Sequence, residues 1–243
     1  ACGFPTTINP IIQNGLKPVF VDIDYSDLNW NLDQIREKIT TKTKAVFSSP
    51  VLGNPYDFDK FLDIIHRYNL EYIADNCDSL GSRWRGDLLT KHAVAASCSF
   101  YPAHHITCGE GGFVSCNDET LEKVIRSFRD WGRGCFCIGK QNITECGACN
   151  KRFSEWLPSI PGEVFDHKYV YEEIGYNLKP IEVQASMLLA QIDKLPDIKR
   201  LRQRNHSLLS KVFEKYEEYF IIPVAQKMSD VNWFAFPLTI KDN

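Results

Sequence analysis

The stretch SFYPAHHITCGEGG, residues 99–112, carries two adjacent histidines, His104 and His105, between an apolar segment and a pair of glycines. Residues 95–101 are short, apolar and poor in charge, which predicts a buried strand, and the glycines predict a turn into a second strand at residues 113–116. Ligands of open α/β sheets bind at the carboxyl ends of strands. Because imidazole exchanges protons near neutral pH, the stretch indicates either a catalytic base or a pair of surface or metal-ligating histidines.

The segments around this stretch alternate between strand and helix patterns. Strands are predicted at residues 17–24, 45–51 and 72–77, and helices at residues 32–39, 59–68 and 119–131. This alternation favours a largely parallel sheet flanked by helices. A long helical pattern begins at Ile181, and Pro196 is expected to kink or break it.

Composition places the chain among ordinary globular proteins. It has 243 residues, of which 44% are hydrophobic and 24% charged, with a net charge of -3, so it can bury a substantial core. We expect no nucleic-acid partner, which would call for a strongly basic surface, and no membrane span, since no apolar run approaches about 20 residues. Without a secretory signal, a cytoplasmic location is expected. The absence of a starting methionine and the abrupt final strand pattern indicate a fragment truncated at both ends.

Cysteine is abundant. The nine cysteines are an odd number, which argues against a closed disulfide framework and leaves metal binding open; they are residues 2, 77, 98, 108, 116, 135, 137, 146 and 149.

The central stretch resembles a known family. Residues 99–112 resemble the pattern Ser-Phe-x-x-x-Lys followed by Gly-Glu-Gly-Gly. That pattern marks the pyridoxal-phosphate lysine segment of the nucleotide-sugar aminotransferases, which share the aspartate aminotransferase fold (fold type I). The resemblance implies a three-layer αβα cofactor-binding domain with a mostly parallel sheet over residues 1–180, incomplete at its N-terminus and with a Cys-rich insertion at about 135–161. Residues 181–243 would form the connecting helix and part of a small C-terminal α/β domain.

One position departs from the family pattern. His104 occupies the lysine position, and no lysine occurs between Lys91 and Lys123. Lysine anchors pyridoxal phosphate as a Schiff base, whereas imidazole can remove a proton but cannot form that anchor. The cofactor would then be held non-covalently, as pyridoxamine phosphate. This feature resembles the 4-keto-6-deoxy-sugar 3-dehydrases, which remove the C3 hydroxyl of a nucleotide sugar. His105 is the weaker candidate for the base because it lies one residue beyond the lysine position.

The resemblance also implies roles for five other residues. Phe4 would stack on the pyridine ring, and Asp75 would pair with the ring nitrogen. Asp78 would lie near the ring, although a helix N-cap role is the alternative. Ser99 would bond the cofactor phosphate, and Asn177 would reach that phosphate from a neighbouring subunit, which implies a homodimer. From the residues alone, Phe4 is equally a buried side chain beside a turn and Asn177 a turn residue.

The cysteine spacing resembles one branch of these dehydrases. Cys77, Cys135 and Cys137 follow a Cys-x57-Cys-x-Cys pattern, similar to the iron–sulfur 3-dehydrases acting on CDP-4-keto-6-deoxyglucose in O-antigen dideoxysugar biosynthesis. The resemblance implies a [2Fe–2S] cluster with Cys149, or alternatively Cys146, as fourth ligand, and an NADH-dependent iron–sulfur flavoprotein reductase as partner. Four cysteines can equally bind structural zinc.

Three rival interpretations stay open. A sugar aminotransferase would need the missing lysine, and a cluster-free 3-dehydrase would leave the cysteine pattern unexplained. A truncated, catalytically silent chain that serves as a binding subunit is the third.

Overall fold

The computed structural model describes residues 2–134 and 152–241, which divide into two compact units. Ala1–Ser115 and Glu182–Asn243 form the first unit, and Cys116–Ile181 form the second. The predicted boundary near residue 180, between a cofactor domain and a C-terminal domain, stays a prediction.

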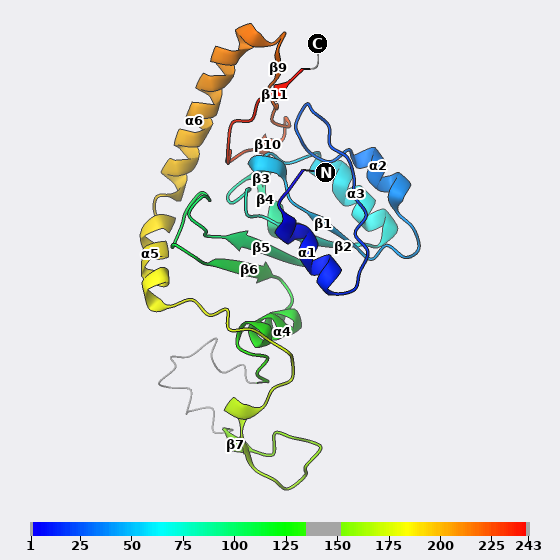
Figure 1. The fold of residues 1–243 in the computed structure, drawn as a ribbon, viewed down its shortest axis with the longest axis vertical. Helices are drawn as coiled ribbons and strands as arrows, with labels where there is room; N and C mark the ends of the chain where they lie inside the picture. The colour runs from blue at the N-terminus through cyan, green and yellow to red at the C-terminus, as the bar shows by residue number, and fades with distance from the viewer. Residues whose placement is uncertain (1, 135–151, 242–243) are drawn as a thin grey trace. The chain divides into compact units, whose positions relative to one another are not determined.

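A four-stranded sheet with the order β1-β2-β5-β6 organises the first unit (Figure 1). Its strands are β1 (Ala45–Ser48), β2 (Glu71–Asp75), β5 (Ala95–Ser99) and β6 (Gly112–Cys116). β2 pairs parallel with both β1 and β5, whereas Figure 1 draws β6 in the opposite direction to β5. The carboxyl ends of β1, β2 and β5 therefore lie at one edge of a mixed sheet, as the α/β prediction requires.

Two capped helices pack into the core of this unit. α2 (Leu32–Lys38) is capped at its N-terminus by Asn31, whose side chain accepts hydrogen bonds from two backbone N–H groups of the first turn. α3 (Phe58–Tyr68) is capped by Asp57, whose carboxylate accepts a hydrogen bond from the backbone N–H of Lys60. Such caps satisfy amides that a helix cannot pair internally. Both helices bury apolar side chains in the main core, which contains Leu32, Ile35, Tyr56, Phe58, Phe61, Ile64, Ile65, Tyr72, Ala74 and Ala96.

The strand predicted at residues 17–24 is wrong, because this segment contributes only an isolated bridge at Ile23. Pro18 has no N–H to donate. The Phe20 carbonyl accepts a hydrogen bond of 2.6 Å from a lysine side chain of α2, and the Asp22 N–H donates over 3.1 Å to a glutamine side chain of the same helix. Side chains of α2 therefore bond backbone groups that a strand would use.

The long helical pattern is interrupted as expected. α5 (Glu182–Ile192) ends before α6 (Leu195–Phe213), in which Pro196 lies in the first turn. Proline is tolerated there because first-turn amides have no partner inside the helix. Leu188, Leu195 and Ile198 of these helices pack against the loop after β5.

Shorter elements complete the first unit: α1 (Pro5–Gln13), η1 (Val51–Gly53), β3 (Arg83–Trp84), β4 (Asp87–Leu88), η2 (Leu89–His92), η6 (Glu214–Tyr216), β9 (Phe220–Ile221), β10 (Ser229–Asp230) and β11 (Thr239–Ile240). β10 pairs with β3, and β11 pairs with β9, both antiparallel. The pairing of β10 with β3 brings the segment after β10 next to the central sheet, where it meets the candidate site.

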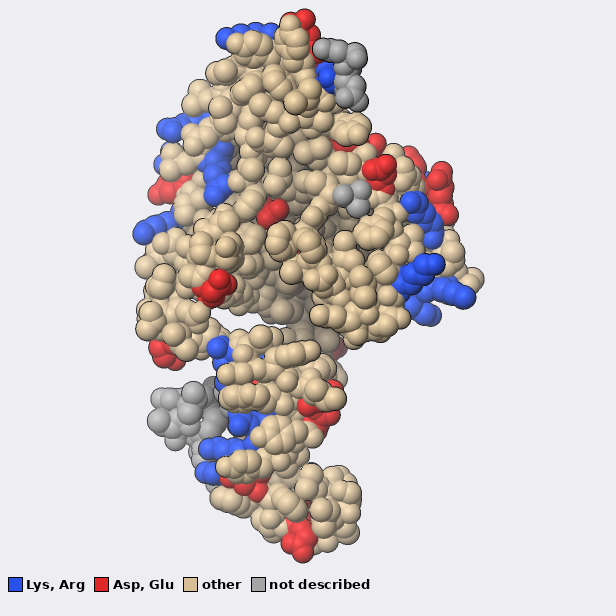
Figure 2. Space-filling view, in the orientation of Figure 1, with Lys and Arg blue, Asp and Glu red and all other residues tan. Residues whose placement is uncertain are grey.

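The second unit contains α4 (Glu119–Arg129), the antiparallel pair β7 (Phe153–Ser154) and β8 (Phe165–Asp166), and η5 (His167–Tyr169). Directly after α4, the buried carboxylate of Asp130 binds Arg133 over 3.2 Å and Lys179 over 2.5 Å. On the face drawn in Figure 2, acidic and basic side chains are mixed. No helix among residues 2–134 and 152–241 is long and apolar enough to cross a membrane.

Candidate active site

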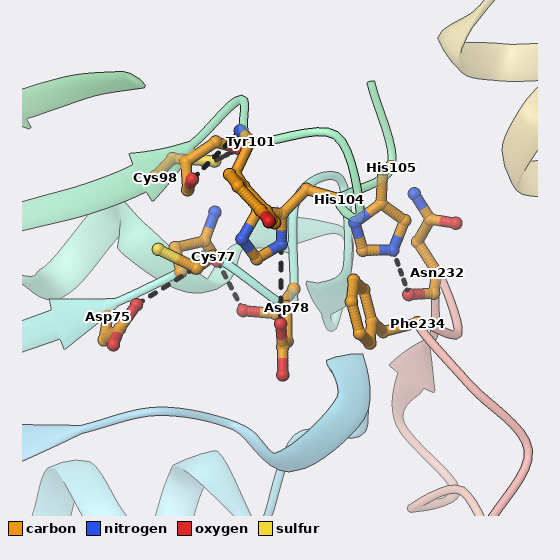
Figure 3. Close-up of polar contacts among 12 residues, drawn as sticks. Asp75, Cys77, Asp78, Cys98, Tyr101, His104, His105, Asn232 and Phe234 are labelled. Carbon is orange, nitrogen blue, oxygen red and sulfur yellow. Dashed lines mark hydrogen bonds and ion pairs between the residues drawn. The ribbon is translucent and has the colours of Figure 1, made fainter. Parts of the chain in front are cut away.

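The candidate residues of the first unit gather where β2 and β5 end (Figure 3). Asp75 is the last residue of β2, and Cys77 and Asp78 follow in the turn. His104 and His105 lie in the loop after β5, and Figure 3 shows the His104 ring facing the turn that carries Asp78. The parallel pairing of β2 with β5 brings these two loops together.

Asp75 is a buried carboxylate, with 7% of the residue exposed. Its Oδ2 accepts a hydrogen bond of 2.6 Å from Thr7 Oγ1 in α1, and its Oδ1 accepts one of 3.2 Å from the Cys77 N–H. In the described part of the chain, no Lys, Arg or His side chain forms an ion pair with it. Because an unpaired buried charge is costly, this site fits a cationic ligand group such as a protonated pyridine nitrogen.

His104 is held at the same edge by its backbone and by Asp78. Its N–H donates to the Tyr101 carbonyl over 3.0 Å, which closes a turn. Its Nδ1 lies 3.6 Å from Asp78 Oδ1 and is buried without a hydrogen-bond partner among the described residues. Burial raises the pKa of Asp78, and the nearby imidazole opposes that rise. The sequence did not predict this carboxylate–imidazole pair.

His105 has a different environment from its neighbour. It is 4% exposed, and its Nε2 lies 2.9 Å from the Asn232 carbonyl oxygen. Burial lowers the pKa of His105 to about 4. An imidazole that is buried and bonded to the backbone is poorly suited to reach a substrate, so the geometry favours His104 over His105 as the base.

Two cysteines lie beside Asp75. Burial raises the pKa of the half-buried Cys77 thiol, and the Asp75 carboxylate adds to that effect. Burial also raises the pKa of Cys98 to about 12. Both side chains are therefore neutral thiols near pH 7 in the absence of a metal, whereas a bound metal would deprotonate a thiol that ligates it.

The predicted cluster cannot be assembled from the described residues. Cys135, Cys137, Cys149 and the alternative Cys146 all lie outside them. Within residues 2–134 and 152–241, no group of three or more His, Cys, Asp or Glu side chains could hold a metal ion. Cys77 is the one predicted ligand that the structure places, so the metal site stays a prediction.

The remaining predicted residues occupy different positions. Ser99 ends β5, and its Oγ accepts a hydrogen bond of 3.1 Å from the Tyr101 N–H, which leaves the hydroxyl proton available to donate. Phe4 immediately precedes α1 and is 70% exposed rather than buried. Asn177 belongs to the second unit, where its side-chain oxygen accepts a hydrogen bond of 2.9 Å from Lys179 Nζ.

Sequence reasoning missed Phe234 and Asn232. The Phe234 ring lies 5.4 Å from the His104 ring and 5.7 Å from the His105 ring, measured between centroids. Asn232 supplies the carbonyl that binds His105. Neither residue carries a local signal, because both lie more than 100 positions further along the chain in a segment with no recognisable motif.

Comparison with known proteins gives consistent matches over the whole chain. The chain is 43% identical over 242 residues to the lipopolysaccharide biosynthesis protein RfbH of Salmonella typhimurium, covering 100% of this chain and 54% of that protein. It is 41% identical over 240 residues to dTDP-4-dehydro-2,6-dideoxy-D-glucose 3-dehydratase of Saccharopolyspora spinosa, covering 99% and 51%.

A solved structure is also similar. The GDP-4-keto-6-deoxy-D-mannose-3-dehydratase of Escherichia coli with bound hydrated PLP matches 100% of this chain and 58% of its own, with a TM-score of 0.82 and 25% identity. The fold is therefore that of the PLP-dependent sugar aminotransferases and dehydratases, which confirms the predicted fold class.

The chain spans about half the length of the curated relatives that it matches. Residues 1–243 match the profile of the DegT/DnrJ/EryC1/StrS aminotransferase family throughout. The chain therefore belongs to the DegT/DnrJ/EryC1/StrS aminotransferase family.

Proposed function

We propose that the protein containing this chain removes the C3 hydroxyl of a nucleotide-linked 4-keto-6-deoxyhexose, with CDP-4-keto-6-deoxy-D-glucose as the first candidate substrate. The observation that carries the proposal is a histidine, His104, at the position of the cofactor-binding lysine and at the same sheet edge as the buried Asp75. Relatives named as sugar 3-dehydratases and as a lipopolysaccharide biosynthesis protein support this substrate class and a role in dideoxysugar synthesis.

Pyridoxamine phosphate is the proposed cofactor, and its ring withdraws electrons from the bonds that react. Asp75 would hold the protonated ring nitrogen, because it is a buried carboxylate without a cationic partner among the described side chains. Phe4 would cover one face of the ring, Asp78 would lie beside it, and the Ser99 hydroxyl would donate to the phosphate. Asn177 of a second copy would donate its amide to the same phosphate, which makes the functional protein a homodimer.

His104 is the proposed base. With the cofactor and sugar bound, the imidazole would accept a proton at the C4′ position, since His104 stands where the family pattern has its lysine. The Asp78 carboxylate, 3.6 Å from Nδ1, would orient the ring for that role. Tyr101 and Phe234 border the ring at 6.5 and 5.4 Å between centroids and limit its rotation.

A [2Fe–2S] cluster is the second part of the proposal. Cys77, Cys135, Cys137 and Cys149, or Cys146 in place of the last, would hold it, and a cluster supplies electrons singly, whereas zinc would supply none. Cys77 supports this arrangement because its N–H bonds Asp75, the residue proposed to hold the cofactor. The electrons would come from an NADH-dependent iron–sulfur flavoprotein reductase.

Anaerobic absorption spectroscopy and metal analysis of the full-length protein test the proposal. About two irons per chain and a brown colour, together with C4′-proton exchange from added pyridoxamine phosphate, are expected. Replacing Cys77 with serine should remove the iron, and replacing Cys98, its buried neighbour in β5, should not. Exchange in a colourless protein would point to a cluster-free 3-dehydrase. An absorbing lysine adduct of pyridoxal phosphate would overturn the dehydrase assignment in favour of an aminotransferase.

A further inference from the structure

The two adjacent histidines differ in what their rings contact. The His104 ring lies at the sheet edge, and its Nδ1 faces Asp78 without a hydrogen-bond partner among the described residues, whereas the His105 ring is buried and faces the segment after β10 (Figure 3). A backbone carbonyl can only accept, so the bond of 2.9 Å to Asn232 requires the proton on Nε2 of His105. Burial holds His105 in its neutral form at pH 7, so this bond persists across the physiological range.

The acceptor of that bond is itself fixed. Asn232 is fully buried, its N–H donates to Ser82 Oγ over 2.9 Å, and its side-chain amide donates to the Leu80 carbonyl over 2.8 Å. Ser82 Oγ in turn donates to the Gly53 carbonyl over 2.8 Å. A side chain at Gly53, which has φ +87, would overlap the Asn232 carbonyl. The oxygen that binds His105 therefore has little freedom to move.

The same segment contacts the proposed base through Phe234. The Phe234 ring lies within 6 Å of both imidazoles, centroid to centroid. Its N–H donates to the Leu52 carbonyl over 2.9 Å, and its carbonyl accepts from Arg202 Nη1 over 2.8 Å. Both histidines thus contact one segment, His105 through a backbone carbonyl and His104 through the Phe234 ring, and this segment is hydrogen-bonded to η1 and to α6.

We propose that His105 is a positioning residue for His104. Its bond to Asn232 fixes the loop after β5, so that the His104 ring stays between Phe234 and Asp78 with one edge turned to the sheet edge where Asp75 lies. His105 touches neither the reacting atoms nor the cofactor in this role. The inference rests on the proposed function, in which His104 is the base, but the bond itself and its effect on the His104 ring do not.

Isosteric substitutions separate this role from general packing. A glutamine amide nitrogen can occupy the place of imidazole Nε2, so His105→Gln retains the donor to Asn232, whereas His105→Asn is too short to reach. Because a displacement of about 1 Å can cost about 100-fold in rate, we expect C4′-proton exchange to fall about 100-fold in kcat for His105→Asn with KM nearly unchanged, and to stay within about threefold for His105→Gln. His66→Asn, an exposed histidine of α3, is the matched control.

A second readout does not need turnover. NMR of the full-length, histidine-labelled protein at fixed pH, with the His104 ring resonance assigned by its loss in His104→Asn, should show a displaced His104 resonance in His105→Asn and a wild-type resonance in His105→Gln. Ser82→Ala removes one of the hydrogen bonds that hold Asn232 without touching either histidine, and it should displace the resonance in the same direction. An unchanged resonance in both His105→Asn and Ser82→Ala would overturn the inference, as would equal losses of exchange in the asparagine and glutamine variants. Absence of exchange in the wild type would overturn the proposed function instead, and the resonance would still decide the role of His105.

Discussion

The middle and the ends of β2 and β5 have opposite chemistry. In the middle, Tyr72 and Ala96 join a core of aromatic rings packed 4.9–6.0 Å apart, in which the Tyr56 and Ser48 hydroxyls bond each other at 2.5 Å. At the ends, Asp75 is buried without a cationic partner among the described residues, and the His104 Nδ1 is buried without a hydrogen bond there. The same strands therefore supply stability along their length and, at their ends and in the loops that follow, polar groups with which a charged ligand can pair.

Replacing His104 tests the chemistry at the strand ends, and it has the largest expected effect. His104→Asn should lower C4′-proton exchange by about 10²–10⁴-fold, the usual range for loss of a general base. Pyridoxamine phosphate binding and the melting temperature should change little, because most of the loop is held by backbone bonds and by His105. Exchange is followed with deuterated water. Lost binding with normal exchange would contradict the assignment of His104.

Phe61→Ala tests the middle of the sheet. This side chain is fully buried and contacts the rings of Tyr56, Phe58 and Tyr72. Its removal should lower the free energy of unfolding by about 3–5 kcal/mol, measured by denaturant titration, and leave the exchange rate per folded molecule unchanged. Tyr68→Ala, at the exposed end of the same helix, is the control, with an expected loss under about 1 kcal/mol. A loss of exchange in folded Phe61→Ala would show that core and site are coupled.

Asp75→Asn should weaken the affinity for pyridoxamine phosphate by about 10- to 100-fold, because a hydrogen bond to a charged group contributes roughly 1.5–3 kcal/mol. Thr7 can still donate to the amide oxygen, so the fold should persist. Affinity is measured by absorbance titration. Asp63→Asn, an exposed carboxylate on α3, should bind normally. Equal affinity in Asp75→Asn and wild type would remove the case for a cationic ring nitrogen at this position.

The smallest expected effect is the loss of stability that His105 causes at acid pH. The pKa of His105 in the folded protein is about 4, below the ordinary value of 6.5. Between these two pH values the unfolded state binds a proton more readily than the folded state, so the stability present above pH 6.5 is lost as the pH falls towards 4. Between pH 6.5 and 5.5, His105→Gln should therefore lose about 1 kcal/mol less stability than the wild type. Urea titrations at both pH values measure this difference. His66→Gln should follow the wild type, and a parallel loss in His105→Gln would show that His105 is already exposed to water.

Local pattern was sufficient for most of the first unit. The apolar spacing predicted α3, β2 and β5 close to their observed bounds, and the proline predicted the break before α6. It failed at residues 17–24, where an apolar alternation does not reveal that α2 side chains bind the backbone.

Much of the candidate site could be predicted, since Asp75 and His104 each follow a strand and parallel strands end at one edge. The contacts of Asn232 and Phe234 could not, because a bond between residues 127 positions apart depends on how the whole chain folds back. Asp130 and Lys179 were missed for the same reason, as they meet across 49 positions in the second unit.

The glycine at position 53 has a further consequence for variation in this protein. Its φ of +87 and the backbone oxygens of Asn232 and Asp78 that surround it leave no room for a side chain, although Gly53 itself, in η1, carries no group that is proposed to react. In a saturation library sorted separately for cellular abundance and for sugar deoxygenation, substitutions at Gly53 should disappear from both pools, whereas those at His104 should disappear from the second alone. The position would thus act as an internal standard that separates failure to fold from failure to react.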